Sequence, residues 1–339
     1  MNSPQHFINH SERKFASDSW ELQQVVSKKT VGILFLFFMF LGWSTHNTGM
    51  DKATLENAKA VGSLMGLCDS KVVSGASNFL KRAFPLQIAS RVETSRIDDF
   101  DRNNLPWFSH TEVVEEKDYD MLAETYSTEK VEYLIYPLGY LFKVIKKMWE
   151  TIEIAFWGTM LSIMISLPLG IMGAKAYTPN KITYFISRGI LGFHRAMPEL
   201  IIALFFVLMY GFGPVAGIFA LALHTSGVLG KFFADEIENA PPGPQKALKV
   251  TGANRLKVLR YSVFPQVFPQ YVAYVQYIFE RNIRTATILG IVGAGGIGVE
   301  LKGRWDLFDY AHVSTILLVI FLTVMLLEYL SQKLRSRSL

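Results

Sequence analysis

Charged side chains within apolar stretches are the residues of this 339-residue chain best placed to do chemistry. An ionised group costs about 2.5–3.5 kcal/mol at the centre of a membrane-spanning helix, so it is expected to face the bundle interior or water. Such groups therefore mark a polar route across a membrane. The candidate residues of this translocation path are Arg195, Glu199, His224, Glu280, Arg281 and Arg284.

Two roles remain open for these charges. Glu280 and Arg284 are four residues apart, so they can form an ion pair on one helix face. That pair would either hold helices in register or line the path. Arg195 has only Glu199 one turn away, and Arg281 has no acid at that spacing. An unpaired guanidinium suits a passing oxyanion, because its planar fork can donate two parallel hydrogen bonds.

A glycine cluster at residues 293–298, GAGGIG, matches the pattern G-x-G-x-x-G. A dinucleotide site would also need a βαβ unit and an acid about 20 residues later. Leu318 stands at that distance, inside an apolar run. The cluster therefore predicts a turn or gate near the outer membrane face, made of Gly293, Gly295, Gly296 and Gly298.

No G-x-x-x-x-G-K-[ST] motif occurs, so the chain is not expected to bind ATP itself. The one cysteine, Cys68, allows neither an intrachain disulfide nor a site with several thiolate ligands. We expect no cofactor and no metal.

A basic segment at residues 245–265, QKALKVTGANRLKVLRYSVFP, lies between two long apolar runs. Gly252 allows a sharp bend between two short helices, and small neighbours let the backbone approach a groove on another protein. Pro265 follows Gly252 by thirteen residues. The segment predicts a contact with a partner on that side of the membrane.

The composition fits an all-α integral membrane protein. Half of the residues are apolar, 13% are aromatic, and the formal net charge is +5. The apolar residues come in runs near spanning length, separated by charged connections. Lys and Arg beside the spans account for the positive charge, so no nucleic-acid partner is expected.

Six spans are predicted. Their approximate ranges are 30–45, 151–174, 186–210, 215–233, 268–292 and 312–330. The first is short, and a signal peptide is the alternative. The late start of the run and the large residues at the would-be cleavage site favour an uncleaved helix.

The predicted domain order follows from these spans. Residues 1–29 form a cytoplasmic N-terminal segment, 30–45 the first transmembrane helix, and 46–148 an extracytoplasmic connection. A short amphipathic helix is expected around 55–65 and an interfacial helix at 138–149. Residues 149–335 form the main transmembrane domain, with a cytoplasmic loop at 240–260. Lys and Arg cluster at alternate ends of the spans, which places both termini in the cytoplasm.

Several blocks resemble the permease subunit of phosphonate-type ABC importers, which have the type I importer fold. They are residues 193–200 (FHRAMPEL), 211–225, 223–238, 241–259 and 279–298 (FERNIRTATILGIVGAGGIG). The resemblance covers about residues 150–335, and Lys246 stands where the family often has an acid. Because it skips residues 86–130, we expect their removal to spare the core fold.

The resemblance implies a transport subunit of the cytoplasmic (inner) membrane, and not an enzyme. A solute-binding protein would deliver phosphonate at the outer face, and a separate ABC ATPase subunit would dock on the 240–260 loop. The family's docking signature is matched here by Ala247, Gly252, Ala253, Arg255 and Pro265. Spans three to five would then rock between outward-open and inward-open states. A second permease copy, as a homodimer, and membrane lipid complete the expected partners.

Three alternatives share part of this pattern. An importer for another small solute, such as phosphite, phosphate or an amino acid, would share almost every feature. An ion-coupled secondary transporter would use the intramembrane charges but leave the Gly252–Pro265 spacing unexplained. A membrane-anchored signalling or structural protein would explain the long connection and little else.

Overall fold

The computed structural model describes residues 28–65, 69–97, 100, 105–106, 108–120 and 125–338. Most of the predicted cytoplasmic N-terminal segment, residues 1–27, and Cys68 lie outside the described residues. The chain divides into two compact units, Met1–Ser77 and Asn78–Leu339. Each unit is described by itself.

The first unit contains α1 (Lys28–Thr48), α2 (Met50–Leu64) and the start of α3 (Lys71–Ala83). The sequence of α1 is long and apolar enough to span a membrane, and its spanning window is 0% buried. A helix that is apolar all round and exposed along its length needs an apolar surrounding such as lipid. The helix extends three residues past the predicted end at 45. The amphipathic helix predicted around 55–65 is confirmed as α2.

The second unit begins with a three-stranded antiparallel sheet that was not predicted. Its strands are β1 (Ser90–Glu93), β2 (His110–Asp120) and β3 (Thr125–Tyr136), in the order β1-β3-β2. A short 3-10 turn, η1 (Thr94–Arg96), follows β1. The strands are rich in Thr, Tyr and Val, which favour extended structure. The fold is mostly helical as predicted, and this sheet is its one departure from an all-α description within the residues described.

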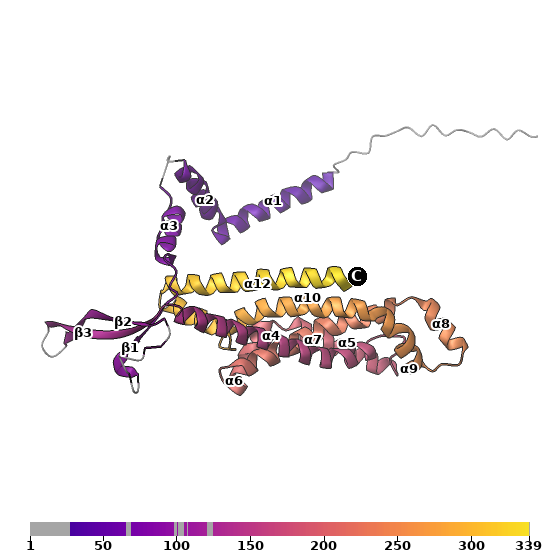
Figure 1. Ribbon diagram of the computed structural model, residues 1–339. Helices are drawn as coiled ribbons and strands as arrows, with labels where there is room; N and C mark the ends of the chain where they lie inside the picture. Colours follow the sequence, from indigo (N-terminus) through magenta and orange to yellow (C-terminus); the bar gives the residue numbers. More distant parts are fainter. Residues whose placement is uncertain are drawn as a thin grey trace, which may run out of the picture. The chain divides into compact units, whose positions relative to one another are not determined.

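A helical bundle makes up the rest of the second unit (Figure 1). Its long helices are α4 (Gly139–Met172), α5 (Lys181–Ala196), α6 (Glu199–Tyr210), α7 (Pro214–Asn239), α10 (Phe264–Ile291) and α12 (Tyr310–Ser338). Helix α7 is central, because it packs against α4, α5, α6 and α10. The helix predicted at 138–149 is present, and it leads into the second span without a break as the first part of α4.

The predicted third span, 186–210, is broken. Helix α5 ends at Ala196 and α6 begins at Glu199, and the two meet at 89°. Pro198 lacks the N–H that an α-helix needs, and it disfavours helical backbone at the preceding residue. Met197 is accordingly extended, with φ −75° and ψ 126°. The proline therefore ends one helix and positions the next at a steep angle.

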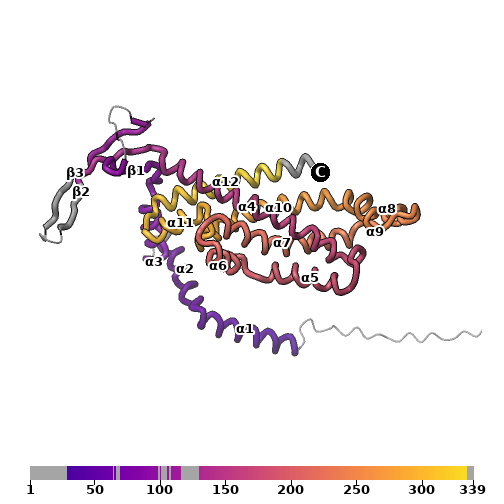
Figure 2. The backbone as a smooth tube through the Cα atoms, turned by 90° about the horizontal axis from the view of Figure 1, so that it is seen from below, coloured from indigo at the N-terminus to yellow at the C-terminus, as the bar shows by residue number. Residues whose placement is uncertain are grey.

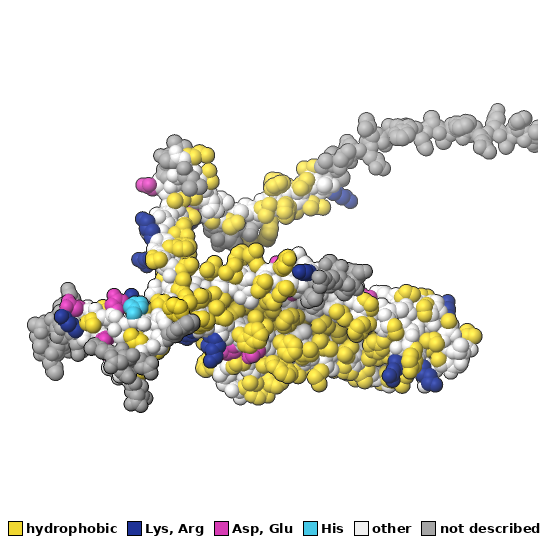
Figure 3. All heavy atoms as spheres, viewed as in Figure 1, with side chains coloured by type: hydrophobic (Ala, Val, Ile, Leu, Met, Phe, Trp, Pro, Cys, Tyr) yellow, Lys and Arg dark blue, Asp and Glu magenta, His cyan; other side chains and the backbone are white. Residues whose placement is uncertain are grey.

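Four helices of the described part are long and apolar enough to span a membrane, or five if the bent pair counts as one. They are α1, α4, α7 and α12. Helix α10 is long enough but carries Glu280, Arg281 and Arg284. The count of six spans stays a prediction. Hydrophobic side chains cover the flank of the bundle in Figure 3, which is the surface a bilayer would contact.

The two ends of the bundle differ. At one end lie α8 (Pro242–Val250), α9 (Arg255–Val258) and a π-helical turn, η2 (Leu259–Val263), which leads into α10. At the other end lie the sheet and α11 (Ile297–Asp306) (Figures 1 and 2). Two buried apolar clusters occupy the bundle, one built around Ile154 and Leu289 and the other, nearer α9, around Phe233 and Val263.

Candidate functional site

A cluster of three ionisable side chains joins α6, α7 and α10. Glu199, in the first turn of α6, contacts both Arg281 of α10 and His224 of α7. The His224 Nε2 lies 3.0 Å from Glu199 Oε1 and 3.2 Å from Arg281 Nη2. The three groups neutralise most of one another's charge at membrane depth, as the cost of burying an ion requires.

The histidine in this cluster is oriented by the backbone. Its Nδ1 lies 3.0 Å from the Met197 carbonyl oxygen. A carbonyl oxygen can only accept, so Nδ1 carries a hydrogen and Nε2 faces Glu199 and Arg281. The break at Pro198 exposes this carbonyl, because no helix continues there to use it. The bend between α5 and α6 thus positions two members of the cluster.

Sequence reasoning missed a buried polar chain next to this cluster. Asn282 donates from Nδ2 to Thr159 Oγ1 at 2.9 Å and accepts from Thr225 Oγ1 at 3.2 Å. The three side chains come from α10, α4 and α7, and each is buried. Uncharged polar residues leave no charge signal in an apolar run. One residue could have indicated this polar chain from the sequence, because Asn282 stands directly beside Arg281.

Arg195 does not pair with Glu199, because the break at Pro198 turns the two side chains apart. Arg195 instead lines a small cavity of about 160 Å³ with Arg188 and Lys231. Arg188 is neutralised by Asp235 at 2.7 Å and by Glu238 at 3.3 Å. Arg195 and Lys231 form no ion pair in the described part of the chain. This leaves two uncompensated positive charges facing one cavity.

The remaining predicted charges form a local pair. Arg284 Nη1 lies 2.8 Å from Glu280 Oε1, as the four-residue spacing indicated. The Arg284 side chain is 43% exposed, so the pair sits at the surface of this single chain and away from the central cluster. The structure thus brings together Glu199, His224 and Arg281, and separates them from Arg195, Glu280 and Arg284.

The glycine cluster forms the turn between α10 and α11. Gly293, Gly295 and Gly296 have φ of +93°, +84° and +74°, a backbone region that side chains disfavour. The turn is fixed to α4, because Gly296 N–H donates to Glu150 Oε1 at 3.0 Å and Ile297 N–H to Thr151 Oγ1 at 2.8 Å. Gly298 packs so closely on α10 that a Cβ would lie 2.1 Å from the Thr287 carbonyl oxygen.

The predicted partner-contact segment consists of two short helices joined by a bend. Gly252 has φ +82°, and open space surrounds the position of a Cβ. Asn254 then caps α9, because its Oδ1 accepts from Lys257 N–H at 2.9 Å. Ala247, Arg255 and Pro265 are exposed.

The segment is exposed on one side and fixed to the bundle on the other. Val250 and Leu256 are 88% and 73% exposed, whereas Leu259 and Val263 are buried in the apolar cluster around Phe233. Gln245 ties α8 to the loop before α5 by accepting from the Tyr177 hydroxyl at 3.1 Å. Within the described residues, no group of His, Cys, Asp and Glu is arranged to hold a metal ion.

Comparison with known proteins assigns the class. The model of the family described as binding-protein-dependent transport system inner membrane component matches residues 166–336. The chain belongs to this family. It is a permease subunit of an ABC importer, a multi-pass protein of the inner membrane, and the ATPase and binding protein of such systems are separate chains.

Three relatives carry related names. The putative phosphite transport system permease protein HtxE of Stutzerimonas stutzeri is 48% identical over 258 residues, which are 75% of this chain and 99% of the relative. HtxC of the same organism, with the same description, is 43% identical over 57% of this chain and 68% of its own length. The phosphate-import permease protein PhnE of Mycolicibacterium smegmatis is 40% identical over 56% of this chain and 35% of its own length.

Solved structures confirm the fold. A chain of the MetNI methionine ABC transporter, in an inward-facing conformation, matches with a TM-score of 0.51 at 20% identity. The match covers 57% of this chain and 95% of that one. A chain of an amino acid ABC transporter matches with a TM-score of 0.51 at 17% identity over 59% of this chain and 95% of that one. The type I importer fold predicted from the sequence is therefore confirmed.

Proposed function

We propose that this permease moves a phosphorus oxyanion, phosphonate or phosphite, from a solute-binding protein into the cytoplasm by alternating access. The names of the relatives support this substrate class. In this chain, the positive charges of Arg195 and Lys231, which form no ion pair within the described residues, face one cavity and can attract such an anion. Phosphate remains the second candidate, because the PhnE relative is named for its import.

The coupling surface is the observation that carries the mechanism. We define it as the exposed apolar residues Val250, Leu256 and Tyr261 on α8, α9 and η2. Exposed apolar groups at a polar end of a membrane protein favour contact with another protein. Their neighbours Leu259 and Val263 are buried in one apolar cluster with Phe233 of α7 and Val267 of α10, so a force on this surface is transmitted to α7 and α10.

The central cluster is assigned to the translocation path. Helices α7 and α10, which receive the push from the coupling surface, also carry His224 and Arg281. A relative shift of these helices changes the distances that join Glu199 to its two partners. The path then opens by exchanging these internal contacts for contacts with the oxyanion or with water. The glycine turn at 293–298 would act as its outer gate.

A second copy of the chain and lipid cover the apolar flank. Helices α5 and α6 expose large apolar side chains such as Phe185 at 78% and Leu208 at 83%. We assign part of this face to a homodimer contact and the rest to the bilayer. Both termini lie in the cytoplasm on this reading, on the same side as α8 and α9, because Lys and Arg cluster there.

The test targets the coupling surface with Val250→Glu and Leu256→Glu. Both sites are exposed, so neither change should impair folding. Each should lower co-purification of the ATPase subunit and abolish ATP-driven uptake of phosphite. Val113→Glu, at an exposed apolar position of β2, is the matched control and should change neither.

Undiminished ATPase binding by the double variant would refute the coupling role. Substrate identity is tested separately in vesicles that hold the full importer. Uptake of methionine with no uptake of phosphite, phosphonate or phosphate would refute the proposed substrate class and leave the coupling role intact.

A further inference from the structure

A second polar cavity lies at the end of the bundle opposite the coupling surface. Its volume is about 380 Å³. Four segments far apart in the sequence line it: Gln87, Ser90 and Arg91 around the start of β1, Tyr140 of α4, Arg304 of α11 and His312 of α12. None of these residues belongs to the translocation path described above.

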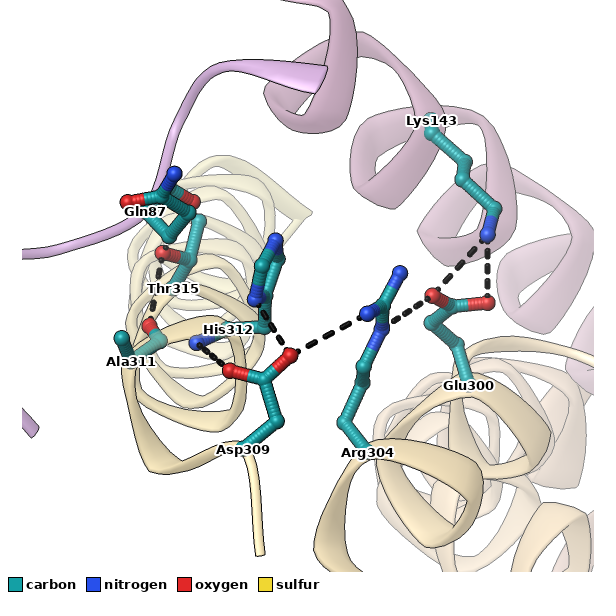
Figure 4. Close-up of polar contacts among 8 residues, drawn as sticks. All are labelled: Gln87, Lys143, Glu300, Arg304, Asp309, Ala311, His312 and Thr315. Atoms are coloured by element: carbon teal, nitrogen blue, oxygen red, sulfur yellow. Dashed lines mark hydrogen bonds and ion pairs between the residues drawn. The ribbon is translucent and has the colours of Figure 1, made fainter. Parts of the chain in front are cut away.

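The backbone wall of this cavity is fixed in place. The N–H groups of Tyr140 and Leu141 donate to the Ile88 carbonyl oxygen at 3.0 and 3.2 Å. The Thr315 hydroxyl donates to the Gln87 carbonyl oxygen at 2.8 Å (Figure 4). The segment before β1 is therefore held between the first turns of α4 and α12. A cavity with such walls is present before any ligand arrives.

A network of ion pairs sets the orientation of Arg304. Its Nε donates to Glu300 Oε1 at 3.2 Å and its Nη1 to Asp309 Oδ2 at 3.1 Å (Figure 4). Lys143 pairs with Glu300 at 2.9 Å, and His312 Nδ1 lies 2.6 Å from Asp309 Oδ2. Neither bond of Arg304 uses its Nη2, which remains able to donate.

Both acids of the network stay ionised near neutral pH. Burial alone raises the pKa of Glu300, but hydrogen bonds and charges from Lys143 and Arg304 outweigh it and hold that pKa below its ordinary value. Burial also raises the pKa of Asp309, but hydrogen bonds and charges from His312 and Arg304 outweigh this effect. They hold that pKa below its ordinary value. The two negative charges are thus committed to Lys143, Arg304 and His312.

Two side-chain donors at the cavity form no hydrogen bond within the described residues, although the Arg304 guanidinium lies over the Tyr140 ring, 5.2 Å from its centroid. The Tyr140 hydroxyl is buried without a hydrogen bond, and the whole residue is 2% exposed. Arg91 forms no ion pair or side-chain hydrogen bond. An unpaired buried hydroxyl costs free energy unless a ligand or water satisfies it. Lys143, Arg304 and Arg91 outnumber the two acids, so the cavity is positive even with His312 neutral.

We propose that this cavity binds a small tetrahedral phosphorus oxyanion. Arg91, the free nitrogen of Arg304 and the Tyr140 hydroxyl supply donors from three elements that line the cavity, β1, α11 and α4. The N-terminal turns of α4 and α12 add the positive ends of two long helix dipoles. This inference rests on the proposed function, because the ligand is the transported substrate. The site would hold the oxyanion between its release from the binding protein and its entry into the path. The same tetrahedral group also occurs in phospholipid headgroups.

The test measures phosphite binding to the purified full chain in a phosphate-free maltoside detergent, without binding protein or ATP. Tyr140→Phe removes only the hydroxyl, and Arg91→Gln removes only the unpaired charge. Each should weaken binding about ten-fold or more, because each removes a hydrogen bond to a charged group. Lys302→Gln, on α11 but paired with Asp306 away from the cavity, is the matched control and should bind as wild type does.

Two outcomes would overturn the site: wild-type protein that binds no phosphite, or variants with wild-type melting temperature that bind it as tightly as wild type. A repeat in phosphatidylglycerol nanodiscs distinguishes the two sources of the ligand. Unchanged phosphite affinity there assigns the site to the free ion. Affinity that falls for wild type but not for Arg91→Gln assigns it to the headgroup. A third result would separate the site from the proposed function. If both variants lose phosphite binding but the importer transports no phosphorus oxyanion, the site stands and the proposed substrate is wrong.

Discussion

The residues of the central cluster show how a membrane protein holds an arginine at depth. Arg281 contacts Glu199, and His224 lies within 3.2 Å of its guanidinium. An oxyanion that passes Arg281 must compete with a fixed carboxylate for the same donors. Arg195 has no such competitor. We therefore expect Arg195 to attract the substrate and the cluster to hold the helices until they move.

Glu199→Gln tests the holding role. The substitution leaves Arg281 charged and partly buried with no anion beside it. Removing one partner of a fully buried pair costs about 3–5 kcal/mol. The Arg281 side chain is 33% exposed, so we expect about 2 kcal/mol, measured as a lower thermal unfolding midpoint of the purified chain.

Glu280→Gln is the control, because it removes an acid from the same region but leaves behind Arg284, which is 43% exposed and therefore better solvated than Arg281. It should cost about 0.5 kcal/mol or less. Equal losses in the two variants would show that Glu199 has no special role. A large loss for Glu280→Gln alone would place the structural pair there.

These residues mark what sequence can and cannot predict. The Glu280–Arg284 pair follows from helix geometry, because residues four apart share a face. Glu199 and Arg281 are 82 residues apart, so their contact depends on how α6 and α10 pack. Arg195 and Glu199 have the same spacing as the confirmed pair. They separate because Pro198 ends the helix between them.

At the scale of elements, the bend between α8 and α9 is the part whose shape sequence described best. A glycine inside a basic segment predicted a sharp turn, and Gly252 has the left-handed backbone that such a turn needs. The shape of that turn depends on the backbone conformation of one residue, which is why the sequence could predict it. The break in the third span has an equally local cause in Pro198, but the prediction included this residue within one span at 186–210.

Gly252→Leu tests the bend. Space around a Cβ is open, so no neighbour clashes, but a side chain in this backbone region costs about 1–2 kcal/mol. The loop should therefore change shape while the bundle stays folded. We expect normal membrane levels and melting temperature with loss of ATP-driven uptake.

Gly243→Leu is the matched control, because Gly243 lies in α8 with equally open space and without a positive φ. It should retain uptake. ATP-driven uptake by Gly252→Leu at the wild-type rate would exclude a role for the bend in coupling.

At the scale of the whole molecule, the connection between the first helix and the bundle is more than an appendage. The sequence predicted that residues 86–130 could be removed without harm. Gln87 and Ile88, however, bind the first turns of α12 and α4, and Leu134 and Ile135 of β3 are buried. Long-range strand pairing and these contacts leave no periodic signal, which is why the sheet was missed.

The expected boundary between the dispensable and the structural part lies within the β2–β3 hairpin. Val114 pairs with Val131 in the antiparallel register. Replacing residues 115–130 by Asn-Gly closes the hairpin with a two-residue turn and retains every pair between Val114 and the base of the sheet. This variant should reach the membrane and unfold at the wild-type temperature, because the base of the sheet and its buried residues Leu134 and Ile135 are retained.

Deletion of residues 86–93 is the contrasting variant. It removes β1 and both backbone acceptors that the bundle uses, so it should lower the melting temperature sharply or prevent insertion. A fully stable protein after this deletion would show that the bundle needs nothing from the connection. The shortened hairpin has a second use: if it folds normally but takes up solute only at high binding-protein concentration, the removed tip contributes to docking of that protein. If uptake instead depends on binding-protein concentration as it does in the wild type, the tip has no part in docking. The connection would then contribute only one wall of the oxyanion cavity.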